Sequence, residues 1–189
     1  MSALSLAVII GTNREGRFGP IVGDWFTEQA REFGGLDVDV IDLAEIDLPT
    51  VIDFGVEPAP EVVELAGRLA AADAYVVVTP EYNHSFPAVL KNAIDLYREE
   101  WQAKPVGFVS YGGMGGGLRA VEQLRLVFAE LHATTVRDTV SFHNAWERFD
   151  ETGAPIDESC NSAAKDMLDQ LTWWARALHA ARAAEPYAA

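Results

Sequence analysis

The sequence is poor in cysteine. Its 189 residues include one, Cys160, so no disulfide can form within the chain and a cysteine-based metal site is not expected. A single thiol suits a reducing compartment. The first residues, MSALSLAVII, carry no basic segment and no small-residue cleavage motif, and their apolar run is too short to cross a membrane. We therefore expect a cytoplasmic protein with no membrane partner.

Positive charge is also scarce. The chain has 14 lysines and arginines against 29 aspartates and glutamates, which gives a formal net charge of -15. Such a surface repels nucleic acid and anionic membranes, so neither is expected as a partner. In so acidic a chain, the closely spaced Arg14 and Arg17 need an explanation.

Several motifs of hydrolytic and metal chemistry are missing. The chain contains no GxSxG and no HExxH, and its 4 histidines are scattered. Because the histidines are scattered, we predict no metal site. No acid–base dyad is evident either, so we predict no catalytic side chain.

The hydrophobic pattern alternates between strand and helix. Strands are predicted over residues 4–10, 37–43, 74–79, 105–111 and 134–142. Helices are predicted over residues 20–33, from residue 60, and over residues 87–97, 118–131 and 161–183. We expect Val63 and Ala70 on the apolar face of the second helix, and Trp173 and Trp174 as a core-and-boundary pair on the last.

Five strands that alternate with five helices predict a doubly wound α/β fold with a parallel sheet, in a single domain over residues 1–189. Ligands of such sheets bind beyond the carboxyl ends of the strands, where the strand order reverses. The loops after the first, third and fourth strands are therefore the candidates for a site.

The first of these loops, GTNREGRFG, leads directly into a helix. A helix N-terminus offers unpaired amides to an anion, and the guanidinium groups of Arg14 and Arg17 suit phosphate oxygens. A nucleotide-triphosphate loop is excluded, because Arg17-Phe18 replaces its lysine and its magnesium-binding hydroxyl. We predict a phosphate site here.

The third loop, within TPEYNHSFPAVLKNAID, crowds polar groups where a buried strand ends. The backbone and side chains of Pro80-Glu81-Tyr82-Asn83 can hydrogen-bond the edge of a flat ring. The glycines of residues 112–117 permit close approach of backbone to its other side.

The segments GTNREGR, TPEYNHSFPAVLKNAID and YGGMGGG, in this order, resemble the NADPH-dependent FMN reductase family. That family is a branch of the flavodoxin-like fold and includes quinone, chromate and azo-dye reductases; the resemblance covers about residues 4 to 180. It implies five parallel strands in the order 2-1-3-4-5. It also implies hydride transfer from NADPH or NADH to FMN, followed by two-electron reduction of a small-molecule acceptor.

The resemblance also implies which residues bind the cofactor. They lie on the three loops: Gly11, Thr12, Asn13, Arg14, Arg17 and Phe18; Pro80, Glu81, Tyr82 and Asn83; and Ser110, Tyr111, Gly112, Gly113 and Met114. Arg17 or Phe18 stands where many members of the family carry serine. The alternative is a flavodoxin-like electron carrier without NAD(P)H reductase activity, which the two arginines and the PEYN sequence disfavour.

The helix over residues 87–97 carries more apolar residues than one buried stripe needs. They are Val89, Leu90, Ala93, Ile94, Leu96 and Tyr97, followed by Trp101. We expect this surplus to lie in a subunit interface beside the flavin, in a homodimer or homotetramer.

Overall fold

The computed structural model describes residues 3–53 and 55–188, which contain one five-stranded parallel sheet in the order β2-β1-β3-β4-β5. The strands are β1 (Leu4–Ile10), β2 (Leu36–Asp42), β3 (Ala74–Pro80), β4 (Pro105–Gly112) and β5 (Thr134–His143). The helices are α1 (Gly19–Phe33), α2 (Pro60–Ala71), α3 (Ala88–Asp95), α4 (Leu118–Glu130) and α5 (Ser159–Ala184), with short 3-10 turns η1 (Glu99–Trp101) and η2 (Ala145–Glu147). The predicted doubly wound fold and its strand order are confirmed.

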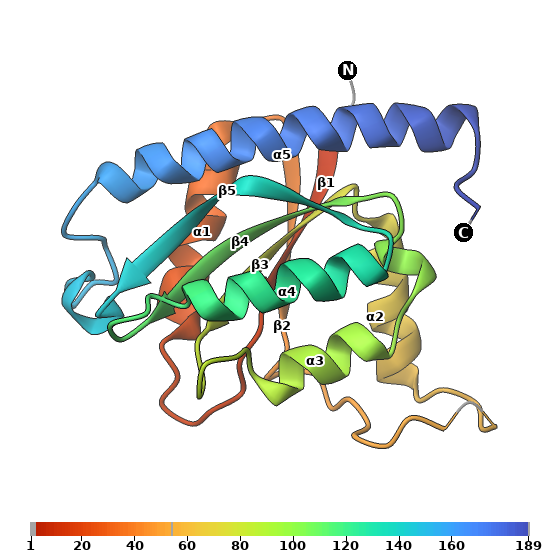
Figure 1. Cartoon of the computed structure of the whole chain (residues 1–189), viewed down its shortest axis with the longest axis horizontal. Coiled ribbons are helices and arrows are strands. Elements are labelled where there is room, and N and C mark those ends of the chain that lie inside the picture. Colours follow the sequence, from red (N-terminus) through yellow and green to blue (C-terminus); the bar gives the residue numbers. More distant parts are fainter. Residues whose placement is uncertain (1–2, 54, 189) are drawn as a thin grey trace.

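The central strands are buried on both sides because helices cover both faces of the sheet. Along β1, Leu6 and Val8 face the layer formed by α1 and α5, while Ala7 and Ile9 face the layer formed by α2, α3 and α4. Figure 1 shows α5 along the top of the molecule and α3 and α4 below it. This two-sided burial explains the continuous apolar runs of β1, β3 and β4.

At each edge strand of the sheet, an arginine from a neighbouring helix binds a backbone carbonyl. On β2, Arg68 of α2 donates to the carbonyl of Val40 at 2.7 Å. On β5, the register with β4 shifts between Thr135 and Thr139, and Arg125 of α4 donates to the carbonyl of Val136 within this bulge at 2.7 Å. These bonds occupy backbone groups that an exposed edge would offer to other strands.

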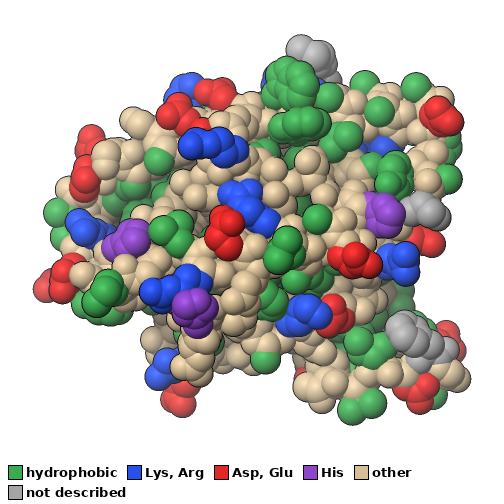
Figure 2. All heavy atoms as spheres, in the orientation of Figure 1, with side chains coloured by type: hydrophobic (Ala, Val, Ile, Leu, Met, Phe, Trp, Pro, Cys, Tyr) green, Lys and Arg blue, Asp and Glu red, His purple; other side chains and the backbone are tan. Residues whose placement is uncertain are grey.

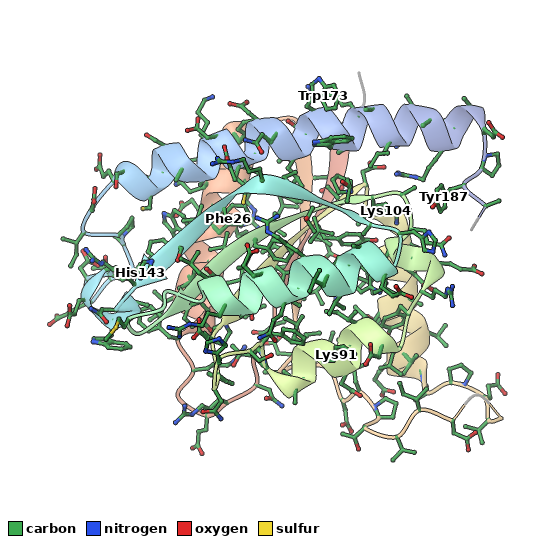
Figure 3. The ribbon with its side chains drawn as sticks, in the orientation of Figure 1. Phe26, Lys91, Lys104, His143, Trp173 and Tyr187 are labelled. Atoms are coloured by element: carbon green, nitrogen blue, oxygen red, sulfur yellow. The ribbon has the colours of Figure 1, made fainter. Side chains whose placement is uncertain are left out.

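Two expectations about the core are wrong. On α2, Val63 is 58% exposed and Ala70 is also exposed, because Leu65 and Leu69 suffice to pack this short helix against the sheet. On α5, Trp173 is 63% exposed and Trp174 is also exposed, so neither belongs to the core. Figure 3 shows Trp173 pointing away from the sheet.

The apolar residues after β3 were predicted to lie on the surface, in a subunit interface, but the structure buries them within the chain. Leu90, Ala93 and Ile94 of α3 are buried, as are Tyr97 and Trp101, and the half-buried Val89 and Leu96 pack on the same cluster. The helix ends at Asp95, so the chain turns Tyr97 and Trp101 inward: the Trp101 indole donates to the carbonyl of Ile94 at 3.2 Å. The residues cited for a subunit interface therefore fill the chain's own core.

Because the strands are parallel, the carboxyl ends of all five strands lie on the same side of the sheet. Figure 1 shows the loops that follow β1, β3 and β4 gathered at the lower left. None of the described helices is long and apolar enough to cross a membrane. On the face shown in Figure 2, acidic and basic side chains are interspersed.

Candidate functional site

The loop after β1 leads into a helix whose first amides are free. The N-cap residue Phe18 has no polar side-chain atom that could cap the helix, and the first backbone bond of α1 runs from the Val22 amide to the Phe18 carbonyl at 3.4 Å. The free amides are those of Gly19 and Ile21, since Pro20 has no N–H. Thr12 is buried below the loop, whereas Asn13 and Arg14 are exposed. The loop thus presents backbone donors and one cation to solvent, a combination that binds anions.

Gly19 lets this loop lie directly on β4. A Cβ atom at position 19 would lie 2.6 Å from Thr12 Cγ2 and 3.0 Å from the Tyr111 hydroxyl oxygen. Only glycine permits so close an approach. The loop is therefore held in place by packing.

Arg17 is committed to an ion pair. Its guanidinium donates to both carboxylate oxygens of Asp42, at 2.6 and 2.7 Å, and to the carbonyl of Thr12 at 2.9 Å. The hydrogen bonds that Arg17 donates to the Asp42 carboxylate raise the pKa of Arg17, although burial opposes this shift. Sequence reasoning missed Asp42, which is the last residue of β2 and 25 positions away from Arg17.

Arg14 is free by comparison. It forms no ion pair with any residue within 3–53 or 55–188, and its guanidinium lies 6.0 Å from the centre of the Tyr82 ring. The Tyr82 hydroxyl shares a 3.0 Å hydrogen bond with the hydroxyl of Thr12. Tyr82 therefore connects the loop after β1 to the loop after β3.

The loop after β3 is a tight turn. The amides and carbonyls of Tyr82 and Ser85 bond reciprocally, at 2.9 and 3.0 Å. The two residues between them, Asn83 and His84, have φ angles of 50° and 73°. This is the backbone pattern of a two-residue type I′ turn, whose central positions usually favour asparagine and glycine.

Glu81 directs its carboxylate into the protein. Its side chain is 10% exposed and pairs with Arg119 of α4 at 2.5 Å. Its amide donates to the carbonyl of Tyr111 at 3.2 Å, so the loop after β3 stays in register with β4.

The glycine loop after β4 is fixed from below. Gly116 and Gly117 adopt φ angles of 59° and 83°. The carbonyl of Gly116 accepts hydrogen bonds from Ser110 at 2.8 Å and from Ser141 at 2.7 Å. Ser110 is thus buried below the loop, whereas Gly112 and Gly113 remain half-buried at its surface.

An exposed apolar rim borders the glycine loop. Met114 is 89% exposed, and Trp146 of η2, 61% exposed, lies beside Gly113. His143, at the left end of β5 in Figure 3, bonds the carbonyl of Met114 at 2.8 Å. Sequence reasoning missed Trp146, because this residue lies in the loop after β5, which was not among the candidate loops.

Tyr111 carries an orphaned polar atom close to the phosphate loop. Its hydroxyl is buried and has no hydrogen-bond partner among the residues that the structure describes, and its ring centre lies 6.2 Å from that of Phe18. Burial raises the pKa of Tyr111, so the hydroxyl stays protonated and able to donate.

These features fit FMN. Free amides and Arg14 suit a phosphate dianion, an unsatisfied donor lies beside them, and the turn after β3 and the glycines after β4 flank the adjoining surface. No group of three or more potential metal ligands occurs among the described residues. The fold and these loops define a flavodoxin-like flavoprotein oxidoreductase.

The chain belongs to the NADPH-dependent FMN reductase family, which it matches over residues 4–147. It is 36% identical over 119 residues to an NAD(P)H-dependent FMN reductase of Schizosaccharomyces pombe, which covers 59% of this chain and 60% of that protein. It is 32% identical over 158 residues to a probable NADPH:quinone oxidoreductase of Oryza sativa, which covers 80% of this chain and 77% of that protein.

Solved structures show the same fold. The flavoenzyme NAD(P)H:(acceptor) oxidoreductase FerB of Paracoccus denitrificans superposes with a TM-score of 0.76 at 22% identity, covering 92% of this chain and 98% of that one. A two-electron reduced flavodoxin of Megasphaera elsdenii superposes with a TM-score of 0.56 at 12% identity, covering 87% and 98%. The chain is accordingly an NAD(P)H-dependent FMN oxidoreductase, and the carrier alternative is not favoured.

Proposed function

We propose that FMN binds across the three loops and that the bound flavin reduces a planar acceptor of the quinone class. The FMN phosphate lies against the loop after β1, and the ring lies between the turn after β3 and the glycine loop after β4. The residues assigned to this site are Gly11, Thr12, Asn13, Arg14, Arg17 and Phe18; Pro80, Glu81, Tyr82 and Asn83; and Ser110, Tyr111, Gly112, Gly113 and Met114.

The observation that carries this proposal is the position of Tyr82. Its hydroxyl bonds Thr12 at 3.0 Å and its ring lies 6.0 Å from Arg14, so one side chain links the phosphate loop to the ring loop. A ligand with a charged end and a flat end fits this arrangement.

The residues have different roles in the site. Arg14 is the free cation that contacts the phosphate, while Arg17, held by Asp42, fixes the shape of the loop. Glu81 acts through its backbone, because its carboxylate is bound by Arg119. When bound, FMN supplies the two-electron chemistry between nicotinamide and acceptor.

The acceptor class rests on the rim and on the relatives. Met114 and Trp146 offer an exposed apolar border on which a flat aromatic molecule can lie. The relative from Oryza sativa is described as a probable NADPH:quinone oxidoreductase, and one from Burkholderia as a 2-hydroxy-1,4-benzoquinone reductase. A quinone satisfies both observations.

The decisive experiment mixes the purified flavin-loaded protein with NADPH under anaerobic conditions, and with NADH in parallel. Loss of the flavin absorbance at about 450 nm on mixing, and its return on adding a quinone, is expected of this oxidoreductase. Flavin that bleaches with dithionite but with neither nicotinamide would instead favour the electron carrier.

We also propose that the protein acts in the cytoplasm as a homodimer or homotetramer. Because the apolar residues of α3 are buried, the support for assembly comes from two exposed leucines of α4. Leu118 is 42% exposed and Leu126 is 75% exposed. These leucines lie eight positions apart, about two helical turns, so they border the same side of α4, with the exposed Glu122 between them. A second copy of the chain is the occupant we assign to that face.

A further inference from the structure

Helix α4 contacts the segment after β3 through two side chains on one of its faces. Arg119 and Gln123 are four positions apart, so they lie one above the other. Arg119 binds the Glu81 carboxylate at 2.5 Å. Gln123, one turn further along, binds the turn formed by residues 82–85.

Both polar atoms of the Gln123 side chain form hydrogen bonds. Its Oε1 accepts a hydrogen bond from the Ser85 hydroxyl at 2.5 Å, and its Nε2 donates to the His84 carbonyl at 2.8 Å. A donor on one side and an acceptor on the other determine which way the amide points. These contacts join residues 38 and 39 positions apart.

The turn needs such support. Asn83 and His84 both have positive φ angles, 50° and 73°, and each carries a side chain that disfavours this conformation. Two such residues in succession persist only when surrounding contacts hold them. Within the turn itself, the reciprocal backbone bonds of Tyr82 and Ser85 contribute; Gln123 adds bonds at the second strained residue and at the one after it.

We propose that Gln123 is a positioning residue for the flavin ring. It holds the turn in the shape in which the Tyr82 hydroxyl reaches Thr12 and the segment from Pro80 to Asn83 faces the ring. It acts through Ser85 and His84 and touches no flavin itself. This inference rests on the proposed placement of FMN.

Three variants test the inference. Gln123→Leu removes both hydrogen bonds at similar size, whereas Gln123→Glu keeps the acceptor for Ser85 and loses the donor to His84. Glu122→Gln, at the exposed neighbouring position of α4, is the matched control. Gln123 is half-buried, so all three variants are expected to fold, which circular dichroism checks.

The first readout needs no flavin. Exchange of the Tyr82 and Ser85 amides is measured by NMR in the apoprotein. Loss of both side-chain bonds is expected to speed exchange by about tenfold in Gln123→Leu, less in Gln123→Glu, and not in Glu122→Gln. Exchange that is unchanged in Gln123→Leu would overturn the inference.

The second readout is flavin affinity. Because Gln123 orders the ring site and not the phosphate site, Gln123→Leu is expected to weaken FMN and riboflavin equally, by about tenfold. Faster exchange with unchanged affinity for both ligands would contradict a positioning role. A wild-type protein that binds neither ligand would overturn the proposed function, and this inference with it. Binding by wild type and Gln123→Leu alike would overturn the inference alone.

Discussion

The Arg17 guanidinium and the Asp42 carboxylate form a two-bonded ion pair, with side chains that are 16% and 13% exposed. Sequence reasoning assigned both arginines of the loop to the phosphate. In the structure, Arg17 ties the loop after β1 to the end of β2, and Arg14 is the loop's unpaired cation among the described residues.

Asp42→Asn is expected to lower the free energy of unfolding by about 2 kcal/mol, because the half-buried guanidinium of Arg17 loses its charged partner. Asp39→Asn is the matched control: Asp39 also binds an arginine through two bonds, but its side chain is 42% exposed and that of Arg68 is 31% exposed. The more exposed pair is expected to contribute under ~1 kcal/mol. Urea unfolding of both variants measures the difference, and equal losses would contradict the structural role of Asp42.

Arg14→Ala is expected to weaken FMN binding by about 10- to 150-fold, since a hydrogen bond to a charged group contributes roughly 1.5–3 kcal/mol. Riboflavin, which lacks the phosphate, is expected to bind wild type and variant equally. Titration of each apoprotein, followed by flavin fluorescence, tests both statements. Arg31→Ala, at the exposed far end of α1, controls for the change in net charge. An equal loss for the two ligands would place the defect in the ring site.

Gly117→Ala is expected to cost about 3 kcal/mol of stability. The φ angle of Gly117 is 83°, and an added Cβ would lie 2.6 Å from the Ser110 Cβ and 2.8 Å from the Tyr111 amide nitrogen. The matched control is Gly67→Ala in α2, where an added Cβ meets nothing within 4 Å and the helix is expected to gain about 0.5–1 kcal/mol. Thermal unfolding of both proteins reports the two signs, and a neutral Gly117→Ala would show that the glycine loop tolerates a side chain.

Lys104 gives a pH dependence. Its ammonium is buried at the opposite end of the sheet from His143 and bonds the carbonyls of Leu69 and Ala70, each at 2.9 Å (Figure 3). Burial, helped by the charge of Arg182, lowers the pKa of Lys104 to about 8. Between this value and the unfolded value of about 10.5, the unfolded chain holds a proton that the folded chain has released, so this group's contribution to stability rises with pH.

The stability difference between wild type and Lys104→Met is therefore expected to rise by roughly 1–2 kcal/mol in favour of wild type from about pH 7.5 to about pH 9.5. Urea unfolding across this range measures it. Lys91→Met, which removes a more exposed lysine paired with Asp95 on α3, is the matched control. The same slope in both comparisons would show that burial of Lys104 does not cause it.

Leu126→Glu is expected to dissociate the proposed assembly, because it places a charge where the exposed Leu126 would be buried against the second copy. Light scattering should give two or four chain masses for wild type and one, 20.6 kDa, for the variant. Trp173→Glu, at an exposed apolar position of α5, is the control and should leave the mass unchanged. A wild-type protein that is already monomeric at micromolar concentration would refute the proposal.

Local patterns were sufficient for much of the fold. The predicted bounds of β1 agree with the structure, and those of α1, β2 and β3 differ by one residue, because the apolar runs end at Pro, Gly or acidic residues that act locally. Exposure was harder to predict from the same patterns. Val63 and Trp174 fit an apolar stripe, but the width of a buried stripe depends on how many neighbours cover the helix.

The sequence by itself determined the alternation of strands and helices along the chain. Such an alternation predicts parallel strands, and therefore that the loops after β1, β3 and β4 lie together at the carboxyl ends of the strands. It could not determine which charged groups pair there. Asp42 forms an ion pair with Arg17, Arg119 forms one with Glu81, and Gln123 forms a hydrogen bond with the turn after β3, across separations of 25, 38 and 39 residues. Such contacts depend on where side chains from distant elements point after the helices pack. Only the tertiary structure therefore decided that Arg14 has no ion-pair partner within the described part of the chain and that the apolar residues of α3 are buried.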